Sequence, residues 1–280
     1  MVVSAAEVVF WSSAALFAIG VVTFFGCSIL AAPYGKYAVA SGQWGPLVPA
    51  KIAWIVMESP NLWVPLLVYL FGSDTVIILN PVNQVLLFCF LLHYTNRSII
   101  YPLRMGKVSP MPLSVMLAAF AFCSWNGSNQ ALSLLLVHSN EHVRLTDMRV
   151  VVGLALFFAG LGVNIHSDSL LLAQRRTTSS STATPRSPSG ASAGAAGAGA
   201  GPKYVVPTGG MFEYVSCANY FGEIVEWWGF ALACGTLPAV AFAFYTMAYL
   251  TSRAIHYHKW YQEKFEDYPK SRKALYPFVL

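Results

Sequence analysis

The sequence predicts an all-α fold: a polytopic membrane bundle of about seven transmembrane helices. Composition is the first reason, because 56% of the 280 residues are hydrophobic and only 10% are charged. Soluble domains carry about 25% charged residues. The second reason is a series of long apolar runs separated by short polar or Gly/Pro-rich loops. No basic stripe stands clear of these runs, which argues against a nucleic-acid partner.

The apolar runs are each about as long as a bilayer-spanning helix. We interpret the first as a retained span, since it lacks a basic leader and a cleavage site. Two prolines, Pro60 and Pro65, are expected to break the second, and the triplet Asn126-Gly127-Ser128 to interrupt the fourth. The last two are expected to separate around Gly229. The predicted spans are 8–30, 51–71, 76–100, 113–137, 149–173, 213–230 and 232–251.

We interpret residues 1–280 as a single membrane domain that contains one disordered cytosolic loop. The loop, 177–202, is rich in Ser, Ala, Gly and Pro and has too few hydrophobic residues to bury a core. None of the five cysteines forms a Cys-x-x-Cys pair, so we expect small buried hydrophobic residues and no metal site.

Positive charge predicts the orientation of the bundle. With seven spans, 15 of the 17 lysines and arginines fall on one side, and only Arg144 and Arg149 fall on the other. Because basic residues concentrate on the cytosolic side, we expect the amino terminus outside and the carboxyl terminus in the cytosol.

Polar and ionisable residues gather at the cytosolic ends of the third, fifth and last two spans. Such groups in apolar segments are costly and usually functional. Arginine suits phosphate because of its planar fork of donors, while tyrosine and asparagine suit a nicotinamide ring and amide. This cytosolic group comprises Asn164, Asp168, Arg175, Tyr204, Asn219, Arg253, Tyr257, Tyr261 and Arg272.

A second group lies deeper and mixes carboxyl, hydroxyl and aromatic side chains. Trp54 and Glu58 share a helical face, and Glu58 has no cation within a turn. Such a set describes an apolar slot with a few placed donors. A phosphate-bearing cofactor above a lipid slot suggests hydride transfer to a lipid. The deeper group comprises Trp54, Glu58, Tyr94, Glu223 and Trp227.

Several motifs, in order along the chain, resemble the steroid 5-alpha-reductase family. The resemblance covers nearly the whole chain except 177–202 and is most specific within 209–275. Its motifs are APYGK (32–36), WIVMESP (54–60), LLHYTNRSIIYPLR (91–104), NIHSD (164–168), GGMFEYVSCANYFGEIVEWWGFALA (209–233) and SRAIHYHKWYQEKFEDYPKSRKAL (252–275).

The resemblance implies a multi-pass enzyme of the endoplasmic-reticulum membrane that uses NADPH to reduce the 4,5 double bond of 3-oxo-Δ4-steroids. It implies that Glu58 and Tyr94 are catalytic and hydrogen-bond the C3 carbonyl oxygen. Glu58 can donate only while protonated. The implied steroid-binding residues are Trp54, Trp227, Tyr249 and Leu250. The implied NADPH-binding residues are Tyr34, Arg97, Asn164, Asp168, Arg175, Tyr204, Asn219, Glu223, Arg253, Tyr257 and Tyr261, with Arg176 an alternative to Arg175 at the phosphate.

Two other functions remain open from the sequence. One is a different lipid double-bond reductase, acting on enoyl-CoA or polyprenol. The other is a transporter with a proton relay through Glu58, His93 and Glu223, although the chain shows no internal repeat. We expect a steroid or sterol and the bilayer as partners, with no obligate protein partner. The sequence does not decide which sterol is preferred.

Overall fold

The computed structural model describes residues 3–30, 35–37, 44–72, 80–106, 108–138, 140–181 and 204–280. The described chain is mostly helical and has almost no sheet, which confirms the all-α prediction. Its one sheet is an antiparallel pair of two-residue strands, β1 (Leu47–Val48) and β2 (Met111–Pro112). The α-helices are α1 (Ala5–Ile29), α2 (Ala50–Glu58), α3 (Pro60–Phe71), α4 (Pro81–Thr95), α5 (Tyr101–Arg104), α6 (Leu113–Leu132), α7 (Met148–Ser181), α8 (Ala218–Cys234) and α9 (Leu237–Lys264).

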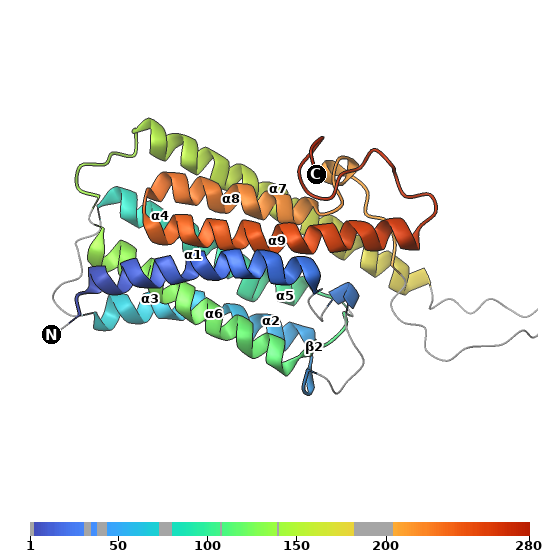
Figure 1. Cartoon of the computed structure of the whole chain (residues 1–280), viewed down its shortest axis with the longest axis horizontal. Coiled ribbons are helices and arrows are strands. Elements are labelled where there is room, and N and C mark those ends of the chain that lie inside the picture. Colours follow the sequence, from blue (N-terminus) through green and yellow to red (C-terminus); the bar gives the residue numbers. More distant parts are fainter. Residues whose placement is uncertain are drawn as a thin grey trace, which may run out of the picture.

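The helices form a bundle of roughly aligned rods (Figure 1). Helices α1 and α9 run parallel and side by side, and the Ser28 and Ser252 hydroxyls meet at 3.2 Å. The α2–α3 pair also runs parallel to α6, because Glu58 meets Cys123 and Asn61 meets Asn126. These directions agree with a chain that reverses at each pass.

Within the described residues, three helical segments are long and apolar enough to cross a membrane, judged by length and composition alone: Ala5–Ile29, Ala50–Phe71 and Met148–Arg175. Together with the helical architecture, they support a multi-pass membrane protein. The second of these segments is broken at Ser59, between α2 and α3, as the prolines predicted. Pro65, by contrast, lies inside α3 without ending it.

Glycines let α7 and α8 pack with their backbones in contact. A Cβ on Gly153 would lie 2.5 Å from the Ala233 nitrogen, and one on Gly229 would lie 2.4 Å from the Phe157 nitrogen. The prediction that Gly229 separates the last two spans was therefore wrong, because this residue is a close-packing position inside α8. The separation falls at Gly235, which ends α8 in the left-handed conformation (φ 63°) that glycine adopts without strain.

Other predicted boundaries also need correction. Helix α6 continues through Asn126-Gly127-Ser128, since Gly127 admits the backbone of Pro60 and Asn61 against it. Helix α7 extends to Ser181, so 177–181 is helical although it was predicted as disordered, and 182–202 lies outside the described residues. Helix α8 begins at Ala218, after a segment that was assigned to the span. Helix α9 continues to Lys264, well beyond the predicted end of its span.

A clasp joins the segment before α8 to the chain after α9. Val215 and Lys273 form a parallel bridge, and the Ser216 and Cys217 nitrogens donate to the Lys273 and Ala274 carbonyls. The Ser216 hydroxyl lies 2.6 Å from both His258 Nδ1 and the Tyr268 hydroxyl, and it also donates to the Lys273 carbonyl. Because the Ser216 hydroxyl donates its one proton to that carbonyl, it accepts hydrogen bonds from the His258 imidazole and the Tyr268 hydroxyl.

The clasp predicts a pH dependence of stability. Partial burial, followed by the charges of Lys273 and Arg272, lowers the pKa of His258. Because the unfolded chain then binds the proton more readily, stability is full above about pH 6.5 and falls as the pH drops toward the folded pKa. Unfolding temperature measured from pH 7.5 to 5 is expected to fall more in the natural protein than in His258→Asn. Equal slopes would remove this role from His258.

Candidate functional site

Arg97 is the centre of a buried ionic cluster. The cluster joins the third pass of the bundle, which carries Arg97, to the fifth and sixth passes, which carry Asp168 and Glu223. Its Nη1 lies 3.1 Å from Asp168 Oδ2 and its Nη2 lies 3.2 Å from Glu223 Oε2. Its guanidinium also lies 5.0 Å from the ring centre of Trp54 and 5.3 Å from that of Tyr101. A buried arginine needs such compensation, because an unpaired buried charge is strongly unfavourable.

Two asparagines bind the carboxylates of this cluster. Asn164 Nδ2 donates to the Asn219 carbonyl at 2.9 Å and to Glu223 Oε2 at 3.2 Å. Asn219 Nδ2 donates to Asp168 Oδ1 at 3.0 Å. The close approach of α7 and α8 at the glycines makes these contacts possible. Asn164, Asp168, Asn219, Glu223 and Arg97, all predicted from sequence, are thus one continuous network.

A second group of donors lies along the carboxyl-terminal half of α9. Arg253 Nε donates to the Tyr220 hydroxyl at 2.9 Å, and Arg253 Nη2 donates to the Tyr257 hydroxyl. Tyr257 stacks between Tyr37 and Tyr220, with ring centres 5.9 and 6.1 Å away. This group therefore brings one buried guanidinium and three phenols together.

Glu58 and Tyr94 lie in the same part of the bundle and are linked through α6. The Cys123 thiol donates to Glu58 Oε2 at 3.6 Å. One turn further along α6, Asn126 Nδ2 donates to the Tyr94 hydroxyl and to Asn61 Oδ1, each at 3.4 Å. Asn61 follows Glu58 by three residues at the start of α3. The carboxyl and the phenol therefore both lie against the same turns of α6.

The predicted steroid-binding residues occupy different surroundings. Trp54 packs against Tyr101 and under Arg97, with ring centres of the two aromatics 5.3 Å apart. Trp227 is fully buried, 5.8 Å from the ring of Tyr94. Tyr249 and Leu250 pack with other residues of α8 and α9, and Tyr249 stacks on Tyr245. The structure brings Trp54 next to the ionic cluster and Trp227 next to the phenol.

The remaining predicted cofactor residues lie farther toward the clasp or outside the described chain. Tyr204 contacts Trp260, with ring centres 5.0 Å apart, and the buried Tyr261 stacks on Tyr268 at 5.4 Å. Arg175 is exposed on α7. Tyr34 lies outside the described residues, as does the side chain of Arg176.

A buried acid–imidazole pair lies beside Tyr94, and its histidine was predicted only as part of a proton relay. His93 Nδ1 lies 2.7 Å from Glu226 Oε1, and both side chains are almost completely buried. The imidazole also lies 4.6 Å from the ring of Trp227 and 5.0 Å from that of Tyr94. Both are ionisable residues in apolar segments, which indicates function, but their pairing depends on how α4 packs on α8.

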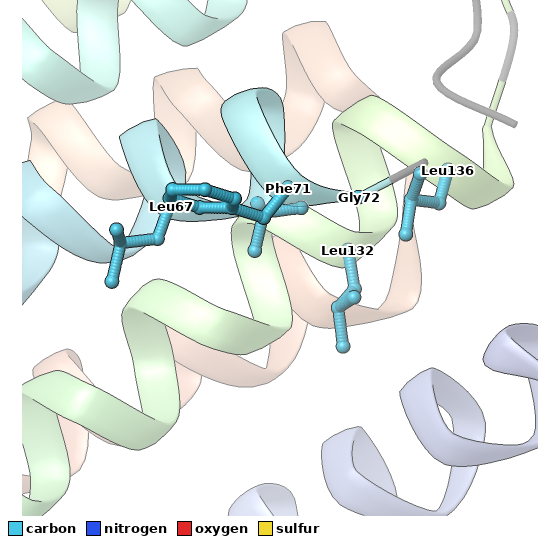
Figure 2. Close-up of a pocket in the computed structure, with 6 residues that line it drawn as sticks. Leu67, Phe71, Gly72, Leu132 and Leu136 are labelled. Carbon is cyan, nitrogen blue, oxygen red and sulfur yellow. The ribbon is translucent and has the colours of Figure 1, made fainter. Parts of the chain in front are cut away.

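An open apolar groove lies farther along α3 and α6 than Glu58 and Asn126. Figure 2 shows Leu67, Phe71 and Gly72 on one side and Leu132 and Leu136 on the other. The described residues that line it are all apolar. Its apolar surface suits contact with lipid tails.

Comparison with known proteins assigns the family. A family model described as 3-oxo-5-alpha-steroid 4-dehydrogenase matches residues 109–189 and 198–280. The protein named 3-oxo-5-alpha-steroid 4-dehydrogenase 1 in Bos taurus is 41% identical over 266 residues, or 94% of this chain and 93% of that protein. The chain belongs to the 3-oxo-5-alpha-steroid 4-dehydrogenase family.

Two human proteins named 3-oxo-5-alpha-steroid 4-dehydrogenase, types 1 and 2, are also similar to this chain. The human type 1 protein is 40% identical, covering 91% of each chain. The human type 2 protein is 37% identical, covering 95% of this chain and 94% of its own. The resemblance inferred from the motifs is confirmed, and the protein is an oxidoreductase. These relatives give no support to a transporter.

Proposed function

We propose that this protein reduces the 4,5 double bond of a 3-oxo-Δ4-steroid to the 5-alpha-3-oxosteroid, with NADPH as the cofactor. The observation that carries the proposal is its similarity, along almost its full length, to proteins named 3-oxo-5-alpha-steroid 4-dehydrogenase. A half-buried carboxyl and a buried phenol against one face of α6, beside a buried ionic cluster, support it. The proposed location is the endoplasmic-reticulum membrane, with the carboxyl terminus in the cytosol.

The proposed roles of Glu58 and Tyr94 follow from the negative charge that develops on the C3 oxygen of the steroid during the reduction. When C5 of the steroid accepts a hydride, the electrons of the C4–C5 double bond move toward the C3 oxygen. Donors already aimed at that oxygen stabilise the resulting enolate more than the ketone. The C3 carbonyl forms again when a proton adds at C4. We assign the two donors to the phenol of Tyr94 and the protonated carboxyl of Glu58.

NADPH, when bound, supplies the hydride for this reduction. The donors gathered by Arg253, Tyr220 and Tyr257 suit its phosphates and ribose hydroxyls. Asn164 Oδ1 is buried and has no partner among the described residues, so it suits a ligand N–H such as that of a carboxamide. Asp168, Asn219 and Glu223 hold this asparagine and Arg97 in place. The other proposed contacts are Tyr34, Arg175, Tyr204 and Tyr261.

A substrate panel tests the proposed function. The purified protein in lipid nanodiscs would be mixed with NADPH and with 3-oxo-Δ4-steroids, enoyl-CoA or a polyprenol. We expect NADPH oxidation and saturated product only with the steroids. Reduction of enoyl-CoA or polyprenol without steroid turnover would replace the proposal with the corresponding lipid reductase.

Glu58→Gln tests the assignment of an acid at the C3 oxygen. The amide keeps the shape and can still donate, but it cannot supply an acidic proton. We expect kcat for steroid reduction to fall about 100-fold, because the amide is a much weaker acid and stabilises the developing oxyanion less than the carboxyl does.

Glu141→Gln is the matched control for this variant. Glu141 is exposed in the loop between α6 and α7, and its substitution should leave turnover unchanged. Full activity of Glu58→Gln would show that no acid is required at position 58.

A further inference from the structure

A chain of buried hydrogen bonds leads from the backbone of α9 to the hydroxyl of Tyr94. Gln130 Nε2 donates to the Pro238 carbonyl at 3.0 Å and to Asn126 Oδ1 at 3.3 Å. Asn126 Nδ2 then donates to the Tyr94 hydroxyl at 3.4 Å. Both amides are 1% exposed, and they are one turn apart on α6. Bulk water is thus no alternative partner for these groups.

The direction of every bond in this chain follows from its first member. A backbone carbonyl can only accept, so Gln130 must present its NH₂ group to Pro238. The same NH₂ group holds the second hydrogen, which points to Asn126, so Asn126 must present its oxygen to Gln130. The NH₂ group of Asn126 is consequently turned toward Asn61 Oδ1 and Tyr94.

The phenol is therefore an acceptor in its only hydrogen bond among the described residues. A tyrosine hydroxyl can accept and donate at once. Because Asn126 occupies it as a donor, the Tyr94 proton is left for some other acceptor. If Asn126 presented its oxygen instead, the phenol would donate to it and the proton would not be available to a ligand.

We propose that Asn126 and Gln130 are positioning residues that hold Tyr94 as a hydrogen-bond donor to the ketone oxygen of a bound steroid. The inference rests on the proposed function, because that function gives the phenol its acceptor. Neither amide touches the reacting atoms. They act by excluding the internal bond that would otherwise compete for the phenol's proton.

Gln130→Glu is expected to reverse the direction of the hydrogen bonds that Asn126 makes, without changing Tyr94 itself. A carboxyl buried against the Pro238 carbonyl stays neutral, because an unpaired buried charge is costly, and its single proton is donated to that carbonyl. Its second oxygen can only accept, so Asn126 must turn its NH₂ group toward residue 130. Asn126 then presents its oxygen to Tyr94, and the phenol donates to that oxygen.

The ultraviolet absorption of the bound enone reports this change directly, without NADPH or turnover. Stronger hydrogen bonds to an enone oxygen shift its main absorption band to longer wavelength. We expect a 3-oxo-Δ4-steroid to show that shift on the natural protein and to lose most of it on Gln130→Glu. Turnover should fall about tenfold in kcat, the equivalent of one hydrogen bond.

Asn129→Asp is the matched control. Asn129 is a buried amide on the same helix, but its Nδ2 donates to Ser13 on α1 and not toward Tyr94. The same amide-to-acid change should leave the absorption shift in place. If Gln130→Glu does not fold, Gln130→Met, which removes the anchor without an acid, should reduce the shift.

The effect of Gln130→Glu must also disappear when residue 94 cannot donate a hydrogen bond. In a Tyr94→Phe background, Gln130→Glu should cause no further loss of kcat or of the absorption shift. Equal losses in both backgrounds, or an unchanged shift in Gln130→Glu and Gln130→Met, would overturn the inference. If the natural protein neither shifts the band nor reduces any steroid of the panel, the proposed function itself fails.

Discussion

Gly160→Ala is expected to separate α7 from α8 and to destabilise the protein by about 3 kcal/mol, the upper range for overpacking a close interface. The added Cβ would lie 2.3 Å from the Glu226 nitrogen and 2.6 Å from the Gly222 carbonyl oxygen. These are backbone atoms, so no side-chain rotation can relieve the clash. The whole helix must move instead.

Gly162→Ala is the matched control for this prediction. Gly162 lies two residues farther along α7, and a Cβ there would meet nothing within 4 Å. Thermal unfolding in detergent should show a large loss for Gly160→Ala and little change for Gly162→Ala. NADPH oxidation should fall only in the first variant, since Asn164 and Glu223 meet across the same interface. Equal melting temperatures would mean that the interface relaxes freely.

Arg97→Met is expected to be the second most damaging single change. It leaves Asp168 and Glu223 buried without their cation, and breaking a buried ion pair in this way costs about 3–5 kcal/mol. It also removes the guanidinium that packs on Trp54. We expect a lower yield of folded protein and a weakened affinity for NADPH, measured by fluorescence titration.

Two further variants separate charge from geometry at this position. Arg97→Lys keeps the charge but cannot reach both carboxylates with one planar group, so an intermediate loss is expected. Arg104→Met removes a nearby arginine that donates to Ser169, a neutral partner, and should cost less. If Arg104→Met were as harmful as Arg97→Met, the buried cluster would not be the source of the effect.

The architecture of the bundle was largely predictable because length and apolar composition determine it. Each expected span corresponds to helices in the described chain, and the break between Glu58 and Pro60 followed from proline chemistry. The errors at Gly229 and at Asn126-Gly127-Ser128 share one cause. Glycine in a sequence reads as an interruption, but here it permits two backbones to touch, which depends on a partner helix that periodicity cannot identify.

The candidate site was likewise predictable from the sequence only in part. Ionisable residues within apolar segments pointed to Arg97, Asp168 and Glu223 individually, and the structure brings them together. The pairing of His93 with Glu226 was not predictable, since those residues lie 133 positions apart in sequence. Neither was the direction of the Asn126 amide, which depends on a carbonyl of α9.

The segment Asn96–Ile100 between α4 and α5 is a π-helix, a wide turn that is commonly found at functional sites. Its first three residues, Asn96, Arg97 and Ser98, are all buried, and the next two isoleucines are exposed. The wide turn changes the direction in which Arg97 and the side chains after it point, relative to a regular helix. Loss of a single residue there would restore ordinary helical geometry at no cost in backbone hydrogen bonds, yet it would rotate the guanidinium away from its carboxylates. We therefore expect deletion of one residue from this segment to be more damaging than a substitution at the exposed Ile99 or Ile100.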